Sequence, residues 1–232
     1  LLTEFMREVR QLTEEWSKKR GHVIKLGARV PAHPDAAKGL GMDGVQWAQE
    51  GLIDMLVPCP FWTTSDFDIQ VELWKERIGE QAKHIVIAPG LEFSTRAYPG
   101  ADPIANDLAT TRGFAASAWY RGADQIYLFN YMDGVKGKYY TNELELCTDP
   151  DLYLKFLNTV ADNEACYKSK RRHLVTFNDV FAPGINEYAP LPLKLPANQD
   201  KSSIEYKYLR LPTGEIDQSL TPYFVIGVEK GT

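Results

Sequence analysis

A glutamate stands directly after a short apolar run near the middle of the sequence. Residues 85–91 (IVIAPGL) are apolar and mostly β-branched at the start, and Glu92 follows them. Apolar surroundings raise the pKa of a carboxyl group or fix its direction, which glycosidic chemistry requires of its acid or nucleophile. We therefore take Glu92 as the candidate catalytic residue. The alternative is that Glu92 caps a loop or pairs with Arg96, four residues further on.

Aromatic and hydrogen-bonding side chains lie at or just after the ends of the other apolar runs, as Glu92 does. Trp62 offers an indole ring on which the C–H face of a sugar can stack, or else it fills its own loop. Arg29 pairs with a substrate or a catalytic carboxylate, or serves as a structural arginine. The candidate substrate-binding residues are Arg29, Trp62, Asp66, Tyr98, Asn130 and Tyr131.

Other kinds of site lack the residues that they need. The four histidines show no pairing at helical spacing, and the three cysteines are too scattered for a thiolate cage. The loops after the last two predicted strands hold one glycine each, where a phosphate cradle needs several exposed backbone N–H groups. No Gly-x-Ser-x-Gly nucleophile motif is present. We expect no metal and no cofactor.

Composition narrows the class of protein and its partners. The chain has 232 residues, of which 44% are hydrophobic and 25% charged, so it can bury a sizeable core. Its net charge is −5 and no basic block interleaves with aromatic residues, which disfavours nucleic acid as a partner. No apolar run approaches the roughly 18–20 residues that span a bilayer, so no membrane span is expected.

Strands and helices alternate along the first two thirds of the chain. Short apolar runs bounded by turn residues predict buried strands at 22–30, 53–58, 84–87 and 125–131. Helical patterns are found at the start of the chain, from Leu1, and at 44–50, 69–79, 107–121 and 149–161. Asp43, Asp68 and Asn106 precede three of these helices and are their predicted N-caps. Asp54, at the start of the second strand, is expected to form structural hydrogen bonds.

This alternation predicts an α/β fold with a parallel sheet, because parallel neighbours need crossover connections. The predicted strands recur every 30 to 41 residues or so, which brackets the roughly 31 residues per unit of a (β/α)8 barrel. Four units make half of a barrel. Either upstream residues or another chain complete it, or the sheet is open and doubly wound. In each case ligands bind beyond the carboxyl ends of the strands, where the candidate residues lie.

The pattern changes after residue 170. Strand-like runs at 173–178, 204–211 and 223–228 are separated by Pro- and Gly-rich turns. We therefore divide the chain into a partial (β/α) barrel, 1–170, and a small all-β segment, 171–232.

Two stretches resemble glycoside-hydrolase-like (β/α)8 barrels. Residues 47–58 (WAQEGLIDMLVP) are similar to the W-x3-G-L-[IV]-D-x-[LI]-x-P stretch of those barrels. Residues 122–131 (GADQIYLFNY) resemble their final strand, G-A-D-G-[IV]-x-x-F-[NS]-[YW]. The resemblance covers the C-terminal half of such a barrel, strands five to eight, and the tail looks like the start of the β-sandwich that often follows it.

The resemblance implies a carbohydrate ligand and a hydrolase acting on O-glycosyl bonds. Glu92 matches the place of the nucleophilic carboxylate of retaining hydrolases, after the seventh strand. Their acid/base partner follows the fourth strand, which would lie upstream of Leu1, so a missing N-terminal half or a homo-oligomer is expected. The residues themselves do not indicate a localisation, and the resemblance implies a secreted or periplasmic one. The alternative is a non-catalytic glycan-binding or structural module of the same architecture, in which Glu92 only forms hydrogen bonds.

Overall fold

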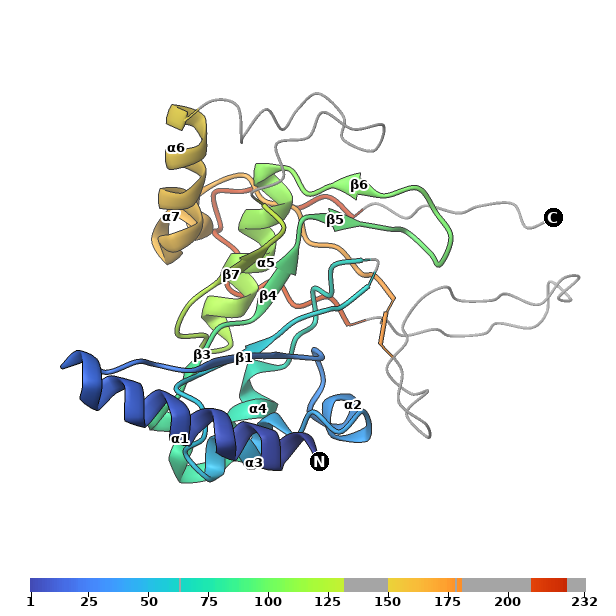
Figure 1. Cartoon of the computed structure of the whole chain (residues 1–232). Helices are drawn as coiled ribbons and strands as arrows, with labels where there is room; N and C mark the ends of the chain where they lie inside the picture. The colour runs from blue at the N-terminus through green and yellow to red at the C-terminus, as the bar shows by residue number, and fades with distance from the viewer. Residues whose placement is uncertain (63, 132–149, 178, 181–209, 225–232) are drawn as a thin grey trace, which may run out of the picture.

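A computed structural model of the chain describes residues 1–62, 64–131, 150–177, 179–180 and 210–224 (Figure 1). Three strands form a parallel sheet in chain order: β1 (Gly27–Val30), β2 (Met55–Pro58) and β3 (Val86–Ile87). Two more parallel strands, β4 (Gly90–Glu92) and β7 (Tyr127–Phe129), pair with each other. A small antiparallel pair consists of β5 (Ser94–Thr95) and β6 (Ile104–Ala105).

The two parallel sheets are joined through the short segment between β3 and β4. Ala88 N donates to Leu56 O of β2 at 2.9 Å, and Tyr127 N of β7 donates to Pro89 O at 3.1 Å. Ile87 faces the same side as Pro89, since Asp124 N, just before β7, donates to Ile87 O at 2.9 Å. Alternate residues of this segment therefore bond to β2 on one side and to the chain at β7 on the other, so the parallel neighbours follow in chain order.

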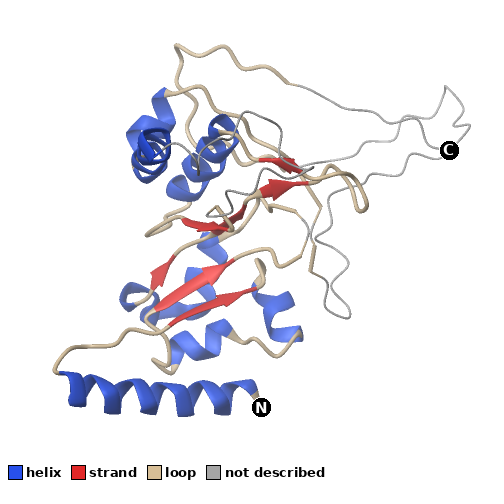
Figure 2. Ribbon diagram, turned by 45° about the horizontal axis from the view of Figure 1, so that its top comes forward, coloured by secondary structure: helices blue, strands red, loops and turns tan. Residues whose placement is uncertain are grey.

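The helices gather in two groups around these strands (Figures 1 and 2). The first group lies with β1–β3, and the second, after β6, lies with β4 and β7. The first group consists of α1 (Leu2–Arg20), α2 (Pro34–Gly39), α3 (Gly44–Gln49), α4 (Val71–Ile78) and a 3-10 turn, η1 (Gly79–His84). The second consists of α5 (Leu108–Tyr120), α6 (Pro150–Ala161) and α7 (Asn163–Lys168).

Each group has its own hydrophobic core. Trp74 and Leu56 are fully buried in the first core, and Phe114 and Phe156 are buried in the second. A third, small hydrophobic cluster consists of Val57, Cys59 and Ala88, and Tyr127 and Phe129 of β7 pack against it. Burial of apolar surface is the main stabilising contribution in both cores.

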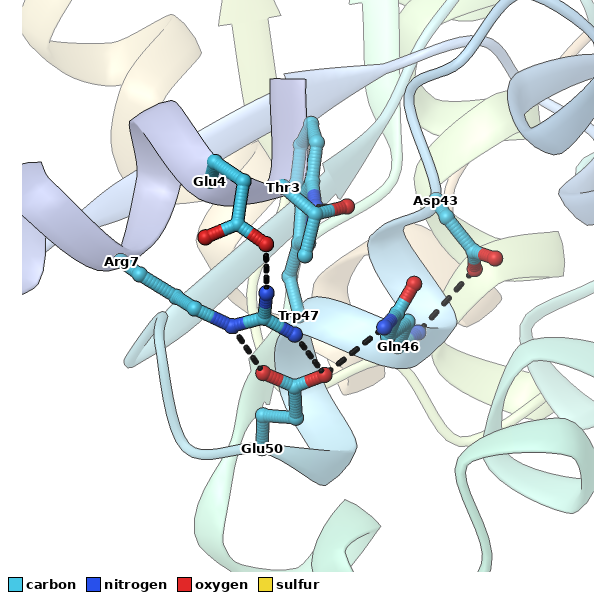
Figure 3. Close-up of polar contacts among 7 residues, drawn as sticks. All are labelled: Thr3, Glu4, Arg7, Asp43, Gln46, Trp47 and Glu50. Carbon is cyan, nitrogen blue, oxygen red and sulfur yellow. Dashed lines mark hydrogen bonds and ion pairs between the residues drawn. The ribbon is translucent and has the colours of Figure 1, made fainter. Parts of the chain in front are cut away.

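Helix α1 is attached mainly through polar side chains. The Arg7 guanidinium contacts Glu4 on its own helix and both carboxylate oxygens of Glu50, at 2.8 and 2.7 Å (Figure 3). In the same view the Trp47 indole N–H, from α3, donates to Thr3 Oγ1 at 3.1 Å. One turn on, Arg10 binds the carboxylate of Asp54 at 2.8 and 3.3 Å.

The expected structural role of Asp54 is confirmed. Besides Arg10, its carboxylate accepts a hydrogen bond from Leu26 N at 2.7 Å, just before β1. Despite partial burial, these hydrogen bonds and the positive charge of Arg10 hold the pKa of Asp54 below its ordinary value. Asp54 therefore connects α1, the start of β1 and the start of β2.

The predicted α/β class with a parallel sheet is confirmed. The strands that the structure describes form no closed barrel and no β-sandwich. In the described parts of the C-terminal segment, 171–177, 179–180 and 210–224, no strand is present. The rest of the predicted strands at 204–211 and 223–228 lies outside the described residues, so the all-β segment stays a prediction.

The predicted helix caps were right at Asp43 and wrong at two other positions. Asp43 caps α3, accepting a hydrogen bond from Gln46 N at 3.0 Å. The cap of α5 is Asp107 and not Asn106, since Asp107 Oδ1 accepts from Thr110 N at 2.8 Å. The N-cap of α4 is Gln70, and Asp68 forms ion pairs instead.

Candidate functional site

The carboxyl ends of the parallel strands place side chains from four segments close together. Arg29 lies near the end of β1, Phe61 follows β2, Glu92 ends β4 and Asn130 follows β7. Because the strands are parallel, their ends meet at one edge, as expected for a ligand site of an α/β fold. We call Arg29, Phe61, Trp62, Glu92 and Asn130 the rim residues.

Glu92 is the central carboxylate of the rim. Its Oε1 accepts a hydrogen bond from Asn130 Nδ2 at 3.2 Å and one from its neighbour Phe93 N at 3.1 Å. Burial raises the pKa of Glu92 above its ordinary value, and the two hydrogen bonds and the positive charge of Arg29 oppose that shift. A partly desolvated carboxyl that is oriented by hydrogen bonds suits either proton transfer or nucleophilic attack.

Asn130 reaches Glu92 from an unusual backbone conformation. Its φ is 63°, the one positive value among the described residues other than glycine. Left-handed backbone is uncommon for a residue with a side chain, although asparagine tolerates it better than most. Such conformations gather at functional sites, where the surrounding structure holds them in place. Here the conformation places the Asn130 amide against the Glu92 carboxylate.

Arg29 lies between two aromatic rings. Its guanidinium carbon is 4.3 Å from the ring centre of Phe61 and 3.9 Å from that of Phe129. Arg29 Nη1 also donates to Pro60 O at 3.0 Å. Contacts of this kind hold a guanidinium in a fixed plane. Arg29 therefore provides a fixed positive charge that stabilises the ionised form of Glu92.

Cys59 lies under the rim and is not a nucleophile. Its side chain is fully buried, and burial raises the pKa of its thiol to about 12, so the reactive thiolate does not form near neutral pH. A Cβ at Gly90 would lie 2.5 Å from Cys59 Sγ, which explains why a residue without a side chain begins β4. Cys59 and Gly90 thus bring β2 and β4 close together.

A buried polar network supports the strand end that carries Glu92. Asn106 Nδ2 donates to Glu92 O and to Ser65 Oγ, each at 2.8 Å. Asn106 Oδ1 accepts from Thr95 Oγ1 at 2.7 Å, and Ser65 Oγ donates to Glu92 O at 2.9 Å. Networks in which every member is satisfied are rigid. Sequence reasoning assigned Asn106 to a helix cap and missed this role.

Asp179 is a second acidic residue at the rim that sequence reasoning missed. Its carboxylate accepts hydrogen bonds from Phe61 N at 3.2 Å and from Trp62 N at 2.7 Å. Its negative charge contributes to the raised pKa of Glu92, after the larger effect of burial. No local pattern in the sequence marks Asp179, because its partners are more than a hundred residues away.

Trp62 and Asp66 lie on the segment that follows β2. Trp62 is 73% exposed, and its ring meets that of Phe61 edge to face with centres 6.3 Å apart. Asp66 is half-buried and accepts a hydrogen bond from Asp68 N at 2.8 Å. Burial raises the pKa of Asp66 to about 6, with a further contribution from the charges of Asp68 and Asp179.

Two other predicted binding residues, Tyr98 and Tyr131, differ from the rim residues in their surroundings. Tyr98 stands in the loop between β5 and β6 and is 39% exposed. Tyr131 is a core residue, 2% exposed, whose ring packs edge to face on Phe93 and stacks on Phe156. Its hydroxyl lies 3.3 Å from Thr111 Oγ1. We therefore leave Tyr131 out of the site, because its hydroxyl faces the interior.

Two further findings concern the described residues as a whole. No group of three or more histidine, cysteine or acidic side chains in the described part of the chain is arranged to hold a metal ion. None of its helices is both long and apolar enough to cross a membrane.

Comparisons with known proteins add no family. No protein-family model matches the chain, and no curated protein matches it. The geometry of the rim residues therefore carries the functional argument.

Proposed function

We propose that the protein is a carbohydrate-active hydrolase in which Glu92 is the catalytic carboxylate, acting on O-glycosyl bonds as nucleophile or general acid/base. The observation that carries the proposal is the environment of Glu92. It ends a parallel strand, is partly desolvated, accepts a hydrogen bond from Asn130 and lies in the field of Arg29. Glycosidases need a carboxyl group prepared in this way.

In the same proposal the parallel strands are consecutive units of a (β/α)8-type barrel. Its support is the strand order, since β1, β2 and β3 are neighbours in chain order, and the segment after β3 passes on to β7. Barrels have this sequential order, whereas doubly wound sheets reverse it at a switch point. The exposed Trp62 supplies a flat apolar surface for a sugar ring at the same edge.

The test compares wild type with Glu92→Gln on a panel of p-nitrophenyl glycosides and on cellohexaose, xylohexaose, maltohexaose and chitohexaose. Glutamine keeps the shape and the hydrogen bond from Asn130 but can neither attack nor exchange a proton. We expect turnover to fall by several orders of magnitude while the oligosaccharide bound by wild type is still bound in calorimetry. Glu80→Gln is the control, because the Glu80 side chain is 92% exposed on η1. Turnover by Glu92→Gln at the wild-type rate would exclude a catalytic role for Glu92.

A non-catalytic glycan-binding module is the second candidate. The observation that favours it concerns Asp179, whose two carboxylate oxygens are both engaged with backbone N–H groups. A two-carboxylate displacement requires a second carboxyl group that can exchange a proton or attack. If this second candidate is correct, wild type binds one of the oligosaccharides without hydrolysing it, and Trp62→Ala weakens that binding.

A further inference from the structure

Asp179 joins the C-terminal segment to the loop that carries Trp62. The N–H groups of Phe61 and Trp62 are consecutive along the backbone, and each is paired with a different oxygen of the Asp179 carboxylate. Consecutive N–H groups form a natural site for an anion, and hydrogen bonds to an ionised acceptor are stronger than neutral ones. The pairing therefore restrains the backbone of the loop at the residue whose side chain is most exposed there.

The segment that carries Asp179 is itself fixed to the fold. Arg172 N donates to Ala109 O of α5 at 2.8 Å, and Thr176 Oγ1 donates to Ser65 O at 2.6 Å. Thr176 and Phe177 are buried. The residues before Asp179 are therefore bound to α5 and to Ser65. Ser65 also donates a hydrogen bond to the backbone oxygen of Glu92.

We propose that Asp179 is a positioning residue of the glycan site: by binding Phe61 N and Trp62 N, it sets the Trp62 indole as the sugar platform on the edge that carries Glu92. The proposal rests on the proposed function, because it assigns Trp62 to sugar binding. It goes beyond that function in making the C-terminal segment a part of the site. Asp179 acts through Trp62 and does not touch the sugar.

Substitution of Asp179 by asparagine removes one of the two acceptor oxygens that bind Phe61 N and Trp62 N. The amide of Asp179→Asn has one acceptor oxygen, and its NH2 group would face a backbone N–H, donor against donor. Asp179→Glu keeps both acceptors on a longer side chain, so it is the conservative variant. Asp217→Asn is the matched control, because Asp217 also accepts a backbone hydrogen bond, from Ser219 N at 2.8 Å, on an exposed loop.

The first measurement needs no sugar. Protein labelled with 5-fluorotryptophan is compared by fluorine NMR, with the Trp62 signal assigned through Trp62→Phe. In Asp179→Asn we expect the Trp62 signal to shift toward that of the unfolded chain while the other four tryptophan signals keep their positions. Asp179→Glu should give an intermediate shift, and Asp217→Asn none. An unchanged Trp62 signal in a folded Asp179→Asn would overturn the proposal.

The second measurement uses the panel substrate that wild type turns over fastest. Asp179→Asn should raise KM about tenfold, the loss expected from one hydrogen bond to a charged group, with less change in kcat. In the Trp62→Ala background Asp179→Asn should raise KM no further, since the two act through one platform. If the increases in KM from Asp179→Asn and Trp62→Ala multiply in the double variant, the proposal is overturned. If wild type neither binds nor hydrolyses any sugar of the panel, the proposed function fails, and the fluorine measurement still decides whether Asp179 positions Trp62.

Discussion

The surroundings of Glu92 make its charge costly in the folded protein. Burial raises the pKa of this carboxyl, and the charge of Asp179 adds to the effect, while Asn130 and Arg29 oppose it. Cys59, which interacts electrostatically with Glu92, is neutral because burial raises the pKa of its thiol to about 12. Functional sites commonly retain groups that lower the stability of the fold, because the same environment prepares the group for its chemistry.

This leads to a prediction about stability and pH. The pKa of Glu92 is higher in the folded than in the unfolded state, so its contribution to stability is fully present below the unfolded value of about 4.3 and is lost as the pH rises through the folded value. Glu92→Gln should therefore increase the free energy of unfolding at pH 7 by about 0.5–2 kcal/mol, with a smaller change at pH 4. Urea denaturation at both pH values measures this.

The control for this experiment is Glu80→Gln, whose side chain is 92% exposed and which should change stability little at either pH. A loss of stability at pH 7 in Glu92→Gln would show that the hydrogen bonds of Glu92 outweigh the cost of its burial.

Single residues of the site differed in how well the sequence predicted them. The sequence predicted that Glu92 and Asn130 lie at neighbouring strand ends, and their side chains are hydrogen-bonded to each other. Tyr131 follows the same strand as Asn130, but its ring turns into the core, where Phe93 and Phe156 pack on it. Asp179 was missed because the contact of its carboxylate with the Trp62 loop depends on tertiary structure alone.

At the scale of elements, the predicted strands and helices of the first 170 residues were found close to their expected positions, since apolar periodicity reflects burial on the sheet and on helix faces. The strand predicted at 173–178 was wrong for residues 173–177, which the structure describes and which form no strand. The side-chain roles at their ends were less predictable. The buried Asn106 side chain forms hydrogen bonds with Ser65 and Thr95 and does not cap α5. Asp107 caps α5 instead. Capping competes with tertiary hydrogen bonds for the same side chain, and the sequence does not show which one prevails.

The contact between α5 and the C-terminal segment gives an element-scale prediction. Gly113 lies on α5 where the chain at Arg172 crosses it, and a Cβ at Gly113 would overlap the Arg172 carbonyl. Gly113→Ala should therefore push the chain at Arg172 away from α5. Overpacking of this kind should lower the free energy of unfolding by about 1–3 kcal/mol. Because Asp179 follows on the same segment, the Trp62 fluorine signal should shift as well.

Gly27→Ala is the matched control for Gly113→Ala. A Cβ at Gly27 would meet Met55 Cβ at 3.6 Å, an ordinary contact, so this variant should be as stable as wild type or slightly more stable. A Gly113→Ala variant that matches Gly27→Ala in stability and leaves the Trp62 signal in place would show that α5 does not fix the segment.

At the scale of the whole molecule, the sequence predicted the class of fold because buried strands alternating with helices require parallel pairing. It did not predict which strands would be neighbours of residues 86–89, because the hydrogen bonds of Ala88 to β2 and of Pro89 to β7 depend on tertiary structure. Nor did it predict how residues beyond 170 attach to the rest. Thr176 and Phe177 are buried, and Thr176 Oγ1 donates to Ser65 O, although sequence patterns place a boundary before them.

Phe177→Ala tests whether residues 171–179 unfold together with the α/β part. Phe177 is 3% exposed, and truncation of a buried phenylalanine costs about 3–5 kcal/mol. If the segment belongs to the same cooperative unit, the whole cost appears in the main transition, and tryptophan fluorescence and far-UV circular dichroism shift together to lower urea concentration. If it is a separate unit, the midpoint of that transition stays at the wild-type value and only the Trp62 signal changes. We expect the first result, because the anchors at Arg172 and Thr176 tie the segment to both α5 and the loop after β2.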